Sequence, residues 1–405
     1  MPRTLYLHIG SHKTGSTSIQ RFLAQNRATL TERGISYPTG ANDVNLNGAL
    51  GAAATTDGNA LAQRAEQVAR LIAQHGADHV IASSEGFSYL IDRPAIQAFH
   101  DALTPTFPTI KVISYLWRQD QFAISHHQEG ANPQTKAAAL LHGHSLTALP
   151  QPSLRQHQYL DYETRIGLWA DVFGDAAMIL RVYDRATLKN GDSIADFLDI
   201  IGLHDLDVTG TEEKNVSMGM VETKLGHLLH GIVTDAHIRS SVQRRLPMTD
   251  RMLPARADAR AFLSPYVEGN CRLNTRFAVT NAANLFSEDF SMFPEQANDQ
   301  WTEATANTAI RACAEVIEHL ASRSMTFPAA DCSAAARALR DIRPDMAEKF
   351  LAAAQGLKPQ SDRIKDRLAK LASRRQSQTD TDDPATHRRA QKRAARQQKP
   401  KLPSP

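Results

Sequence analysis

The stretch HIGSHKTGSTSIQ, residues 8–20, follows a short apolar segment near the start of the chain. Its two glycines, Gly10 and Gly15, have the spacing of the Walker A loop, G-x-x-x-x-G-K-[ST]. In a Walker A loop the lysine directly follows the second glycine, whereas here Ser16 follows it and Lys13 lies inside the loop. The stretch therefore predicts a phosphate-binding loop that differs from the loop of an ATPase.

The segments on either side of this loop favour an anion site. Residues 4–10 alternate in polarity as a strand does, and residues 18–34 carry apolar side chains at helical spacing. Where a strand, a glycine turn and a helix start meet, backbone N–H groups converge and the helix dipole adds about half a positive charge. Gly15 permits the tight backbone, and Lys13 supplies a full charge beside it. The alternative is an ordinary strand-to-helix turn with a serine cap.

The segment HKTGSTSIQ resembles the 5′-phosphosulfate loop of the sulfotransferases that use 3′-phosphoadenylyl sulfate (PAPS), whose pattern is roughly P-K-x-G-[ST]-[ST]. His12 stands where this family has a proline. The resemblance implies a P-loop-like α/β fold, with Lys13 on the bridging and 5′-phosphate oxygens. It also implies that the 5′-phosphate is wrapped by Thr14, Gly15, Ser16, Thr17 and Ser18. The GK[ST] ending that serves magnesium and the γ-phosphate in an NTPase is missing.

The same family holds the 3′-phosphate with an arginine at a strand end and a serine about eight residues later. Residues 112–128, VISYLWRQDQFAISHHQ, have this layout, with Arg118 and Ser125 seven apart. Trp117 lies eight before Ser125, where many relatives carry a second arginine. The resemblance implies that Arg118 and Ser125 bind the 3′-phosphate. The alternative is that Arg118 pairs with Asp120 on the surface.

An acceptor hydroxyl needs a base whose pKa is tuned toward the working pH. Glu85 follows the predicted strand 79–83, which places its carboxylate at the ligand-binding edge of a sheet. Several glycan sulfotransferases use a glutamate as the base, whereas cytosolic ones use a histidine. Glu85 is therefore the predicted base, with His12, His126 and His127 as rivals, and its structural alternative is a cap on the next turn. The sixteen histidines show no metal-ligand spacing, so we predict no catalytic metal.

Strand patterns alternate with helix patterns up to about residue 215. Predicted strands cover residues 4–10, 79–83, 109–117 and 177–183, and predicted helices include 18–34, 61–76, 158–174 and 193–203. The later segments 179–185, 193–203 and 215–217 also resemble the family. This order predicts a three-layer α/β fold with a central parallel sheet. We expect this core over residues 1–215, a helical extension or cap of the same domain over 216–330, C-terminal helices over 331–373 and a disordered basic tail over 374–405.

The composition is that of an ordinary globular protein, with 42% hydrophobic and 22% charged residues. The three cysteines form no C-x-x-C pair, which excludes a disulfide scaffold and fits a reducing compartment. No apolar run approaches the roughly 20 residues that span a bilayer, and we find no secretory signal, so we expect a cytoplasmic protein.

The net charge of +3 is unevenly distributed. Residues 356–405 carry 14 Lys and Arg and 5 Asp, a balance of +9, which leaves 3 − 9 = −6 for the remainder. No aromatic residue is interleaved in the tail to stack on bases, so we expect a solvated end and no nucleic-acid partner. Removing the tail should leave PAPS binding intact.

The sequence thus predicts a cytoplasmic, metal-independent sulfotransferase. It would move the sulfuryl group of PAPS to a hydroxyl or amine of a glycan, lipid or small molecule, with residues 130–160 and the region after 218 shaping the acceptor site. One alternative is a P-loop kinase or NTPase. Another is a nucleotide-binding protein that has lost transfer activity, which the departures at Trp117 and Arg118 would suit.

Overall fold

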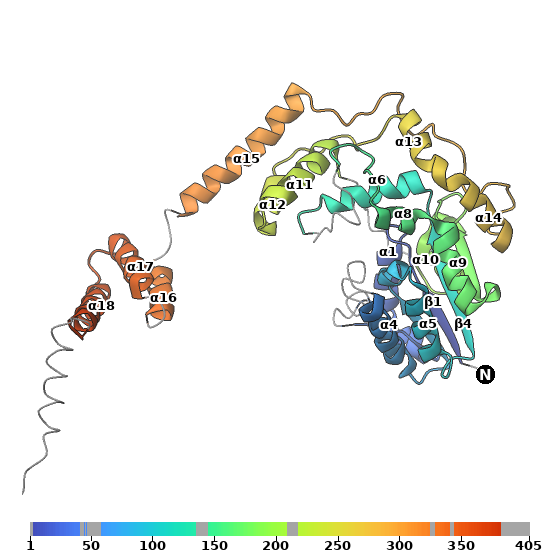
Figure 1. Cartoon of the computed structure of the whole chain (residues 1–405), viewed down its shortest axis with the longest axis horizontal. Coiled ribbons are helices and arrows are strands. Elements are labelled where there is room, and N and C mark those ends of the chain that lie inside the picture. The colour runs from blue at the N-terminus through green and yellow to red at the C-terminus, as the bar shows by residue number, and fades with distance from the viewer. Residues whose placement is uncertain are drawn as a thin grey trace, which may run out of the picture. The chain divides into compact units, whose positions relative to one another are not determined.

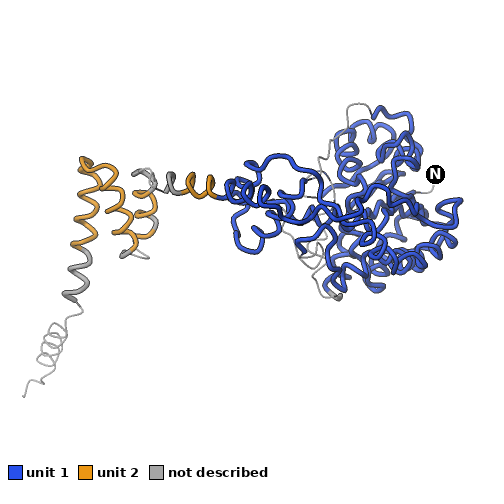
Figure 2. Tube along the Cα trace, turned by 90° about the horizontal axis from the view of Figure 1, so that it is seen from above, with its two compact units in different colours: residues 1–313 blue, residues 314–405 orange. Residues whose placement is uncertain are grey.

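The chain forms two compact units, residues 1–313 and 314–405 (Figure 2). The computed structural model describes residues 3–40, 44, 46, 58–134, 145–208, 218–324, 329–340 and 344–381. Three segments named above lie outside the described residues: 135–144 of the expected acceptor region, the family-like segment 215–217, and 382–405 of the basic tail.

A five-stranded parallel sheet forms the centre of the first unit, in the order β2-β3-β1-β4-β5 (Figure 1). The strands are β1 (Thr4–His8), β2 (Ile35–Ser36), β3 (His79–Ser83), β4 (Thr109–Leu116) and β5 (Met178–Val182). The central strand β1 pairs with β3 on one side and with β4 on the other. The chain leaves β1 toward one edge of the sheet and later crosses from β3 to β4, so the carboxyl end of β1 is a topological switch point, where α/β sheets bind ligands.

Helices cover both faces of this sheet. One face packs against α1 (Ser16–Gln25), α2 (Arg27–Glu32) and α10 (Ser193–Ile200) through a cluster that includes Phe22 and Phe197. The other face packs against α4 (Gly58–Ala73), α5 (Arg93–Leu103) and α9 (Tyr162–Phe173) through a cluster that includes Phe99 and Trp169. Because successive strand side chains point to opposite faces, Leu5 joins the second cluster while Tyr6 packs against the first. The predicted three-layer, P-loop-like α/β fold with a central parallel sheet is confirmed.

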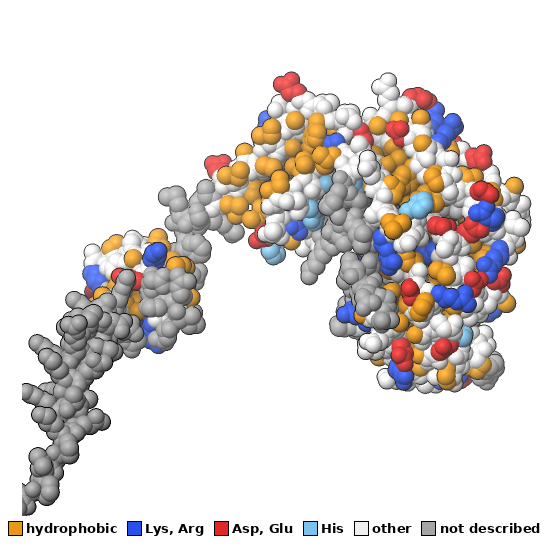
Figure 3. Space-filling model, in the orientation of Figure 1, with side chains coloured by type: hydrophobic (Ala, Val, Ile, Leu, Met, Phe, Trp, Pro, Cys, Tyr) orange, Lys and Arg blue, Asp and Glu red, His pale blue; other side chains and the backbone are white. Residues whose placement is uncertain are grey.

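The first unit has further helices besides those that cover the two faces of the sheet. They are α6 (Gln119–Gly130), α8 (Leu154–Leu160), α11 (Met220–Ile232), α12 (Ala236–Gln243), α13 (Arg256–Leu263), α14 (Val267–Phe277) and the start of α15 (Glu303–Ser324). Ile124 of α6 shares an apolar cluster with Leu263 of α13 and with Phe290. Hydrophobic side chains gather on the surface over α11, where Leu228 and Ile232 are exposed (Figure 3).

The described residues of the first unit also form four 3₁₀ turns, and one of them carries a predicted site residue. They are η2 (Glu85–Tyr89), η3 (Asp175–Ala177), η4 (Lys189–Gly191) and η5 (Ser264–Tyr266). The turn η2 follows β3 directly. Because β3 pairs with β1 in register, Glu85 lies at the same edge of the sheet as the loop after β1.

The second unit contains α16 (Ala329–Leu339), α17 (Pro344–Leu357) and α18 (Asp362–Thr381). Small and branched apolar side chains such as Ala347, Leu351 and Ile364 form its core. The helix α18 continues past residue 374, where we expected a disordered tail to begin, so the helical part of the chain reaches at least Thr381. The helix α15 spans the boundary between the units, which lies at 313 rather than near 330. Within the described ranges, no helix combines the length and apolarity needed to cross a membrane.

Candidate functional site

The loop of residues 9–15 leaves the carboxyl end of β1 and stays tied to the neighbouring strand β4. The Ser11 N–H donates to the carbonyl of Tyr115 over 3.3 Å, and the Tyr115 N–H donates to the carbonyl of Gly10 over 2.9 Å. These two bonds extend the β1–β4 ladder into the loop. The start of the loop is therefore fixed by the sheet itself, and only its second half is shaped locally.

Three residues of this loop adopt left-handed backbone conformations. Gly10 has a φ of 90°, Lys13 of 61° and Gly15 of 79°. Such residues ahead of a helix are typical of backbone nests that bind anions. Lys13 adopts this conformation although it is not a glycine, a strain that clusters at functional sites. The loop thus has the left-handed backbone that such nests share, and the anion site stays a prediction.

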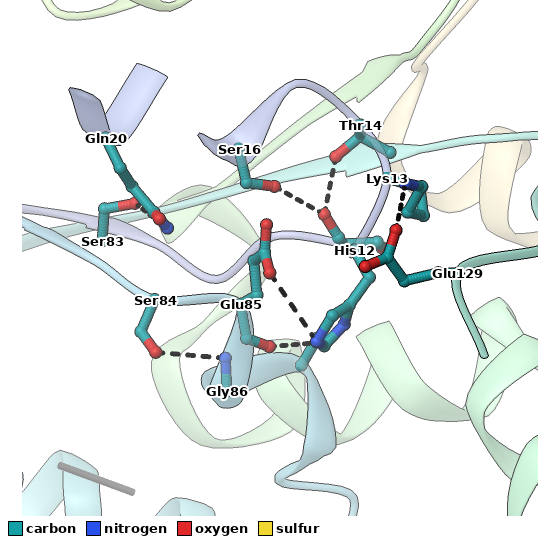
Figure 4. Close-up of polar contacts among 12 residues, drawn as sticks. His12, Lys13, Thr14, Ser16, Gln20, Ser83, Ser84, Glu85, Gly86 and Glu129 are labelled. Atoms are coloured by element: carbon teal, nitrogen blue, oxygen red, sulfur yellow. Dashed lines mark hydrogen bonds and ion pairs between the residues drawn. The ribbon is translucent and has the colours of Figure 1, made fainter. Parts of the chain in front are cut away.

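The hydroxyl groups of the loop divide into two kinds. Thr14 Oγ1 and Ser16 Oγ both donate to the carbonyl of Ser11, over 2.7 and 2.8 Å, and both residues are buried (Figure 4). Thr17 is exposed and Ser18 is half-buried. We predicted that all of these hydroxyls could face a phosphate. The structure instead uses the protons of Thr14 and Ser16 to brace the loop.

The helix α1 begins at Ser16 with Gly15 as its N-cap, and this glycine has no side chain to cap the first N–H groups. By contrast, α10 is capped by Asp192, which accepts from two backbone N–H groups, and α5 is capped by Asp92. The first N–H groups of a helix attract anions when no carboxylate occupies that position. The start of α1 thus fits a ligand phosphate.

The side chain of Lys13 reaches across to α6. Its Nζ donates to Glu129 Oε2 over 3.2 Å, with both side chains partly exposed (Figure 4). Ser125 lies one turn earlier on the same helix, so it belongs to the face of α6 that carries Glu129. The structure therefore brings α6, with Ser125, close to the loop. Glu129 was missed by the sequence reasoning, although its spacing of four from Ser125 is a signal that could have found it.

Glu85 lies beside this loop with its side chain 18% exposed. Burial raises its pKa from 4.5 to about 7, while the charge of Lys13 acts in the opposite direction. The structural alternative for Glu85 was a cap on the next turn. That role is taken by Ser84, whose hydroxyl accepts from the Gly86 N–H over 3.1 Å, so the carboxylate of Glu85 is left to face the loop (Figure 4).

Of the three rival histidines, two lie near Glu85. His12 Nε2 is 3.9 Å from Glu85 Oε2. The ring of His126 packs 5.7 Å from the ring of His12. His127 turns away, with its Nε2 2.9 Å from the carbonyl of Ser145.

Two residues that the sequence reasoning did not select also belong to this site. The hydroxyl of Tyr159, on α8, lies 3.0 Å from His12 Nδ1. Arg165, on α9, is 1% exposed and donates through Nη2 to Ser11 Oγ over 2.9 Å. Arg165 is three residues after Tyr162 and four before Trp169, so it lies on the apolar face of its helix. A charged residue on such a face is the sequence feature that could have identified it.

Arg118, the predicted 3′-phosphate ligand, is held by the protein itself. Its Nε and Nη2 donate to the two carboxylate oxygens of Asp120 over 2.8 and 2.9 Å, and Nη1 donates to the carbonyls of Ser287 and Asp289. Its guanidinium also lies 4.3 Å from the ring centre of Phe290. The pairing with Asp120 that we weighed as the alternative is present, but it is buried and not on the surface. A phosphate contact by Arg118 would require the guanidinium to exchange these partners.

Two aromatic side chains lie beside the second glycine of the loop. The rings of Trp117 and Tyr183 meet edge to face, with their centres 5.5 Å apart. The Tyr183 ring lies 3.6 Å from where a Cβ on Gly15 would be. Both side chains are half-buried. They form an apolar, aromatic wall next to the loop of residues 9–15. Across the described parts of the chain, no group of three His, Cys, Asp or Glu side chains is arranged to hold a metal ion.

No protein-family model matches the chain. An uncharacterized protein of Archaeoglobus fulgidus is 27% identical over 94 residues, which cover 23% of this chain and only 22% of that relative. Among solved structures, a sulfotransferase from Alicyclobacillus acidocaldarius is similar at 13% identity with a TM-score of 0.38, covering 69% of this chain and 97% of that chain.

Proposed function

We propose that the protein is a PAPS-dependent sulfotransferase that acts on a hydroxyl or amine of a glycan, lipid or small molecule. The observation that carries the proposal is the pairing of a cation and a buried carboxylate at one loop. Lys13 stands inside the loop in a left-handed conformation, and Glu85 faces the same loop from the end of β3. Sulfuryl transfer needs a cation for the leaving oxygen and a base for the acceptor proton.

The residues present fit the donor. The uncapped start of α1 and the left-handed loop would hold the 5′-phosphate through Lys13 and residues 14–18. Ser125, on the face of α6 toward the loop, would contact the 3′-phosphate, and Arg118 would join it only by leaving Asp120. The aromatic wall of Trp117 and Tyr183 offers an apolar surface for a purine.

In the proposed reaction, the acceptor oxygen or nitrogen attacks the sulfur in line with the leaving 5′-phosphate oxygen. A bond from the acceptor to sulfur forms as the bond from sulfur to the phosphate oxygen breaks, and that oxygen keeps the electron pair. The acceptor proton passes to Glu85. Lys13 stabilises the charge that develops on the phosphate oxygen, which favours the transition state over the ground state.

The burial of Glu85 suits this role. A carboxylate whose pKa lies near 7 can hold the transferred proton and still be ionised in part of the population at neutral pH. An NTPase would instead need side chains that hold magnesium at the end of the loop. Here the position after Gly15 is Ser16, whose hydroxyl donates to the carbonyl of Ser11. The experiment below distinguishes the sulfotransferase from a P-loop kinase or NTPase and from a nucleotide-binding protein without transfer activity.

The proposal is tested by following PAPS consumption with pooled glycan, phenol and amine acceptors. Transfer should occur, and Lys13→Ala should slow it by several powers of ten. Lys111→Ala is the matched control. Lys111 lies near the start of β4, at the end of the strand away from the loop, and its Nζ donates to the carbonyl of Ala176. Magnesium-dependent ATP hydrolysis without PAPS consumption would favour the NTPase, and full activity in Lys13→Ala would falsify the mechanism.

A further inference from the structure

A group of hydrogen-bonded side chains, from His12, Ser88 and Tyr159, lies beside Glu85. The Tyr159 hydroxyl accepts from the backbone N–H of His12 over 3.2 Å, and it lies 3.0 Å from His12 Nδ1 and 3.0 Å from Ser88 Oγ. Ser88 Oγ donates to the carbonyl of Glu85 over 2.6 Å. This group joins η2, the start of the phosphate loop and α8.

We propose that His12 pairs with ionised Glu85 through its Nε2–H, and that Tyr159 is the positioning residue that holds His12 in the tautomer with its proton on Nε2. This inference rests on the proposed function, because it takes Glu85 as the base. It changes the status of His12 from a rival of Glu85 to its partner. His12 stands where the loop pattern has a proline, which has no side chain able to do this.

The positions of the protons follow from counting donors. Glu85 must be ionised to accept a proton, and His12 Nε2 faces its Oε2 at 3.9 Å. Beside an ionised carboxylate, a neutral imidazole carries its proton on the facing nitrogen, so Nδ1 is then an acceptor. The two hydroxyls near Nδ1 belong to Tyr159 and to Ser88, which lies 3.2 Å away. The single proton of Ser88 is donated to the carbonyl of Glu85, so Tyr159 is the hydroxyl left to donate to Nδ1, and the inference places its proton there and not on Ser88 Oγ, which lies 3.0 Å away.

Arg165 holds Tyr159 in place. Its guanidinium lies 4.6 Å from the ring centre of Tyr159 and 5.0 Å from that of Tyr162, while Nη2 donates to Ser11 Oγ. Its Nε and Nη1 make no hydrogen bond within the described part of the chain. A buried guanidinium packed on two aromatic rings fixes the ring that carries the hydroxyl, and also the start of the loop that carries His12.

Other charged or titratable groups surround the pair from several elements. From the loop, η2, α6, α8 and α9 they are Lys13, Tyr89, His126, Glu129, Arg155 and Arg165. The 3.9 Å gap between His12 and Glu85 is long for a hydrogen bond but within the range of an ion pair. Once the two side chains close this gap, the Nε2–H of His12 can donate to ionised Glu85 and stabilise its charge, and the acceptor proton then binds to Glu85 while His12 keeps its own proton.

The test is a tautomer measurement that needs no acceptor. Protein labelled with ¹⁵N in its histidine rings is studied by NMR above the pKa of Glu85, and the signals of His12 are assigned by their loss in His12→Gln. We expect the Nε2–H tautomer in the wild type and a mixture of tautomers in Tyr159→Phe. Tyr266→Phe is the matched control, because it removes a similar tyrosine–histidine contact of 2.8 Å at His157 and should leave His12 unchanged.

The activity assay adds a second readout. Tyr159→Phe should lower kcat about tenfold and move the pH midpoint of the rate, with the affinity for 3′,5′-phosphoadenosine unchanged. An Nδ1–H tautomer in the wild type overturns the inference even if the variant fails to fold. So does a variant that binds 3′,5′-phosphoadenosine and keeps both the tautomer and the pH midpoint. Absence of 3′,5′-phosphoadenosine binding by the wild type would instead count against the proposed function, so the two failures are distinguishable.

Discussion

Ser193, the first residue of α10, packs directly against Gly15 in the loop of residues 9–15. A Cβ placed on Gly15 would lie 2.7 Å from the Cβ of Ser193, closer than side chains approach in practice. Gly15 also has a φ of 79°, which other residues rarely adopt. The loop is thus shaped by its own backbone and by a helix nearly 180 residues later in the chain.

Gly15→Ala should therefore destabilise the protein more than an alanine at another position with a left-handed backbone does, because it also clashes with Ser193. Gly34→Ala is the matched control, because Gly34 has a φ of 74° with no heavy atom near a Cβ. We expect Gly34→Ala to cost about 1–2 kcal/mol of unfolding free energy in urea, and Gly15→Ala to cost more. The double variant Gly15→Ala/Ser193→Gly should recover the excess. Equal losses in the two alanine variants would contradict the steric account.

Glu129→Gln should strengthen donor binding. The Glu129 carboxylate lies 3.2 Å from Lys13 Nζ, so it competes with a phosphate for the same ammonium group. Removing its charge should raise the affinity for 3′,5′-phosphoadenosine severalfold, as measured by calorimetry at low ionic strength. Glu163→Gln, which breaks a comparable ion pair with Arg272, should have no effect. Weaker binding by Glu129→Gln would show that Glu129 positions Lys13 and does not compete with the ligand.

The pKa of Glu85 predicts how stability depends on pH. Because the folded-state pKa is raised from 4.5 to about 7, the folded state binds this proton more tightly than the unfolded state. The contribution of Glu85 is fully present below pH 4.5 and is lost as the pH rises through about 7. Glu85→Gln stays neutral, so its unfolding free energy relative to the wild type should increase between about pH 5 and about pH 8. A constant difference across this range would mean that Glu85 titrates as it does in the unfolded chain.

Arg118→Ala should lower the stability of the protein more than it lowers the affinity for 3′,5′-phosphoadenosine. The variant leaves buried Asp120 without the guanidinium that contacts both of its oxygens, which costs about 3–5 kcal/mol when a buried ion pair loses one partner. Because each guanidinium nitrogen has a partner in the protein, we expect the folded variant to bind 3′,5′-phosphoadenosine almost as the wild type does. A large loss of affinity with unchanged stability would assign Arg118 to the 3′-phosphate.

The parts of the site that local pattern determines could be predicted from the sequence. The spacing of Gly10, Lys13 and Gly15 after an apolar strand indicated a tight strand-to-helix loop, and the end of a second strand placed Glu85 beside it. Both follow from rules that act over a few residues. The alternation of strands and helices was likewise enough to predict the parallel sheet.

The remaining features depend on contacts between distant segments. Arg118 turns toward residues 287–290 because their carbonyls accept from it, and no spacing near Arg118 indicates that. The hydroxyl of Tyr159 reaches His12 across 147 residues, and Arg165 reaches Ser11 across 154. Such pairings are set by how α8 and α9 pack on the sheet, which a single sequence does not reveal.

The central claim is that the loop around Lys13 binds the nucleotide of a sulfuryl donor. Calorimetry with 3′,5′-phosphoadenosine tests it most directly, using wild type, Lys13→Ala and the control Lys111→Ala, with ATP and magnesium as the competing ligand. The account predicts tight binding to the wild type and to Lys111→Ala, at least about tenfold weaker binding to Lys13→Ala, and little displacement by ATP. No binding of 3′,5′-phosphoadenosine to the folded wild type, or equal binding to Lys13→Ala, would contradict it.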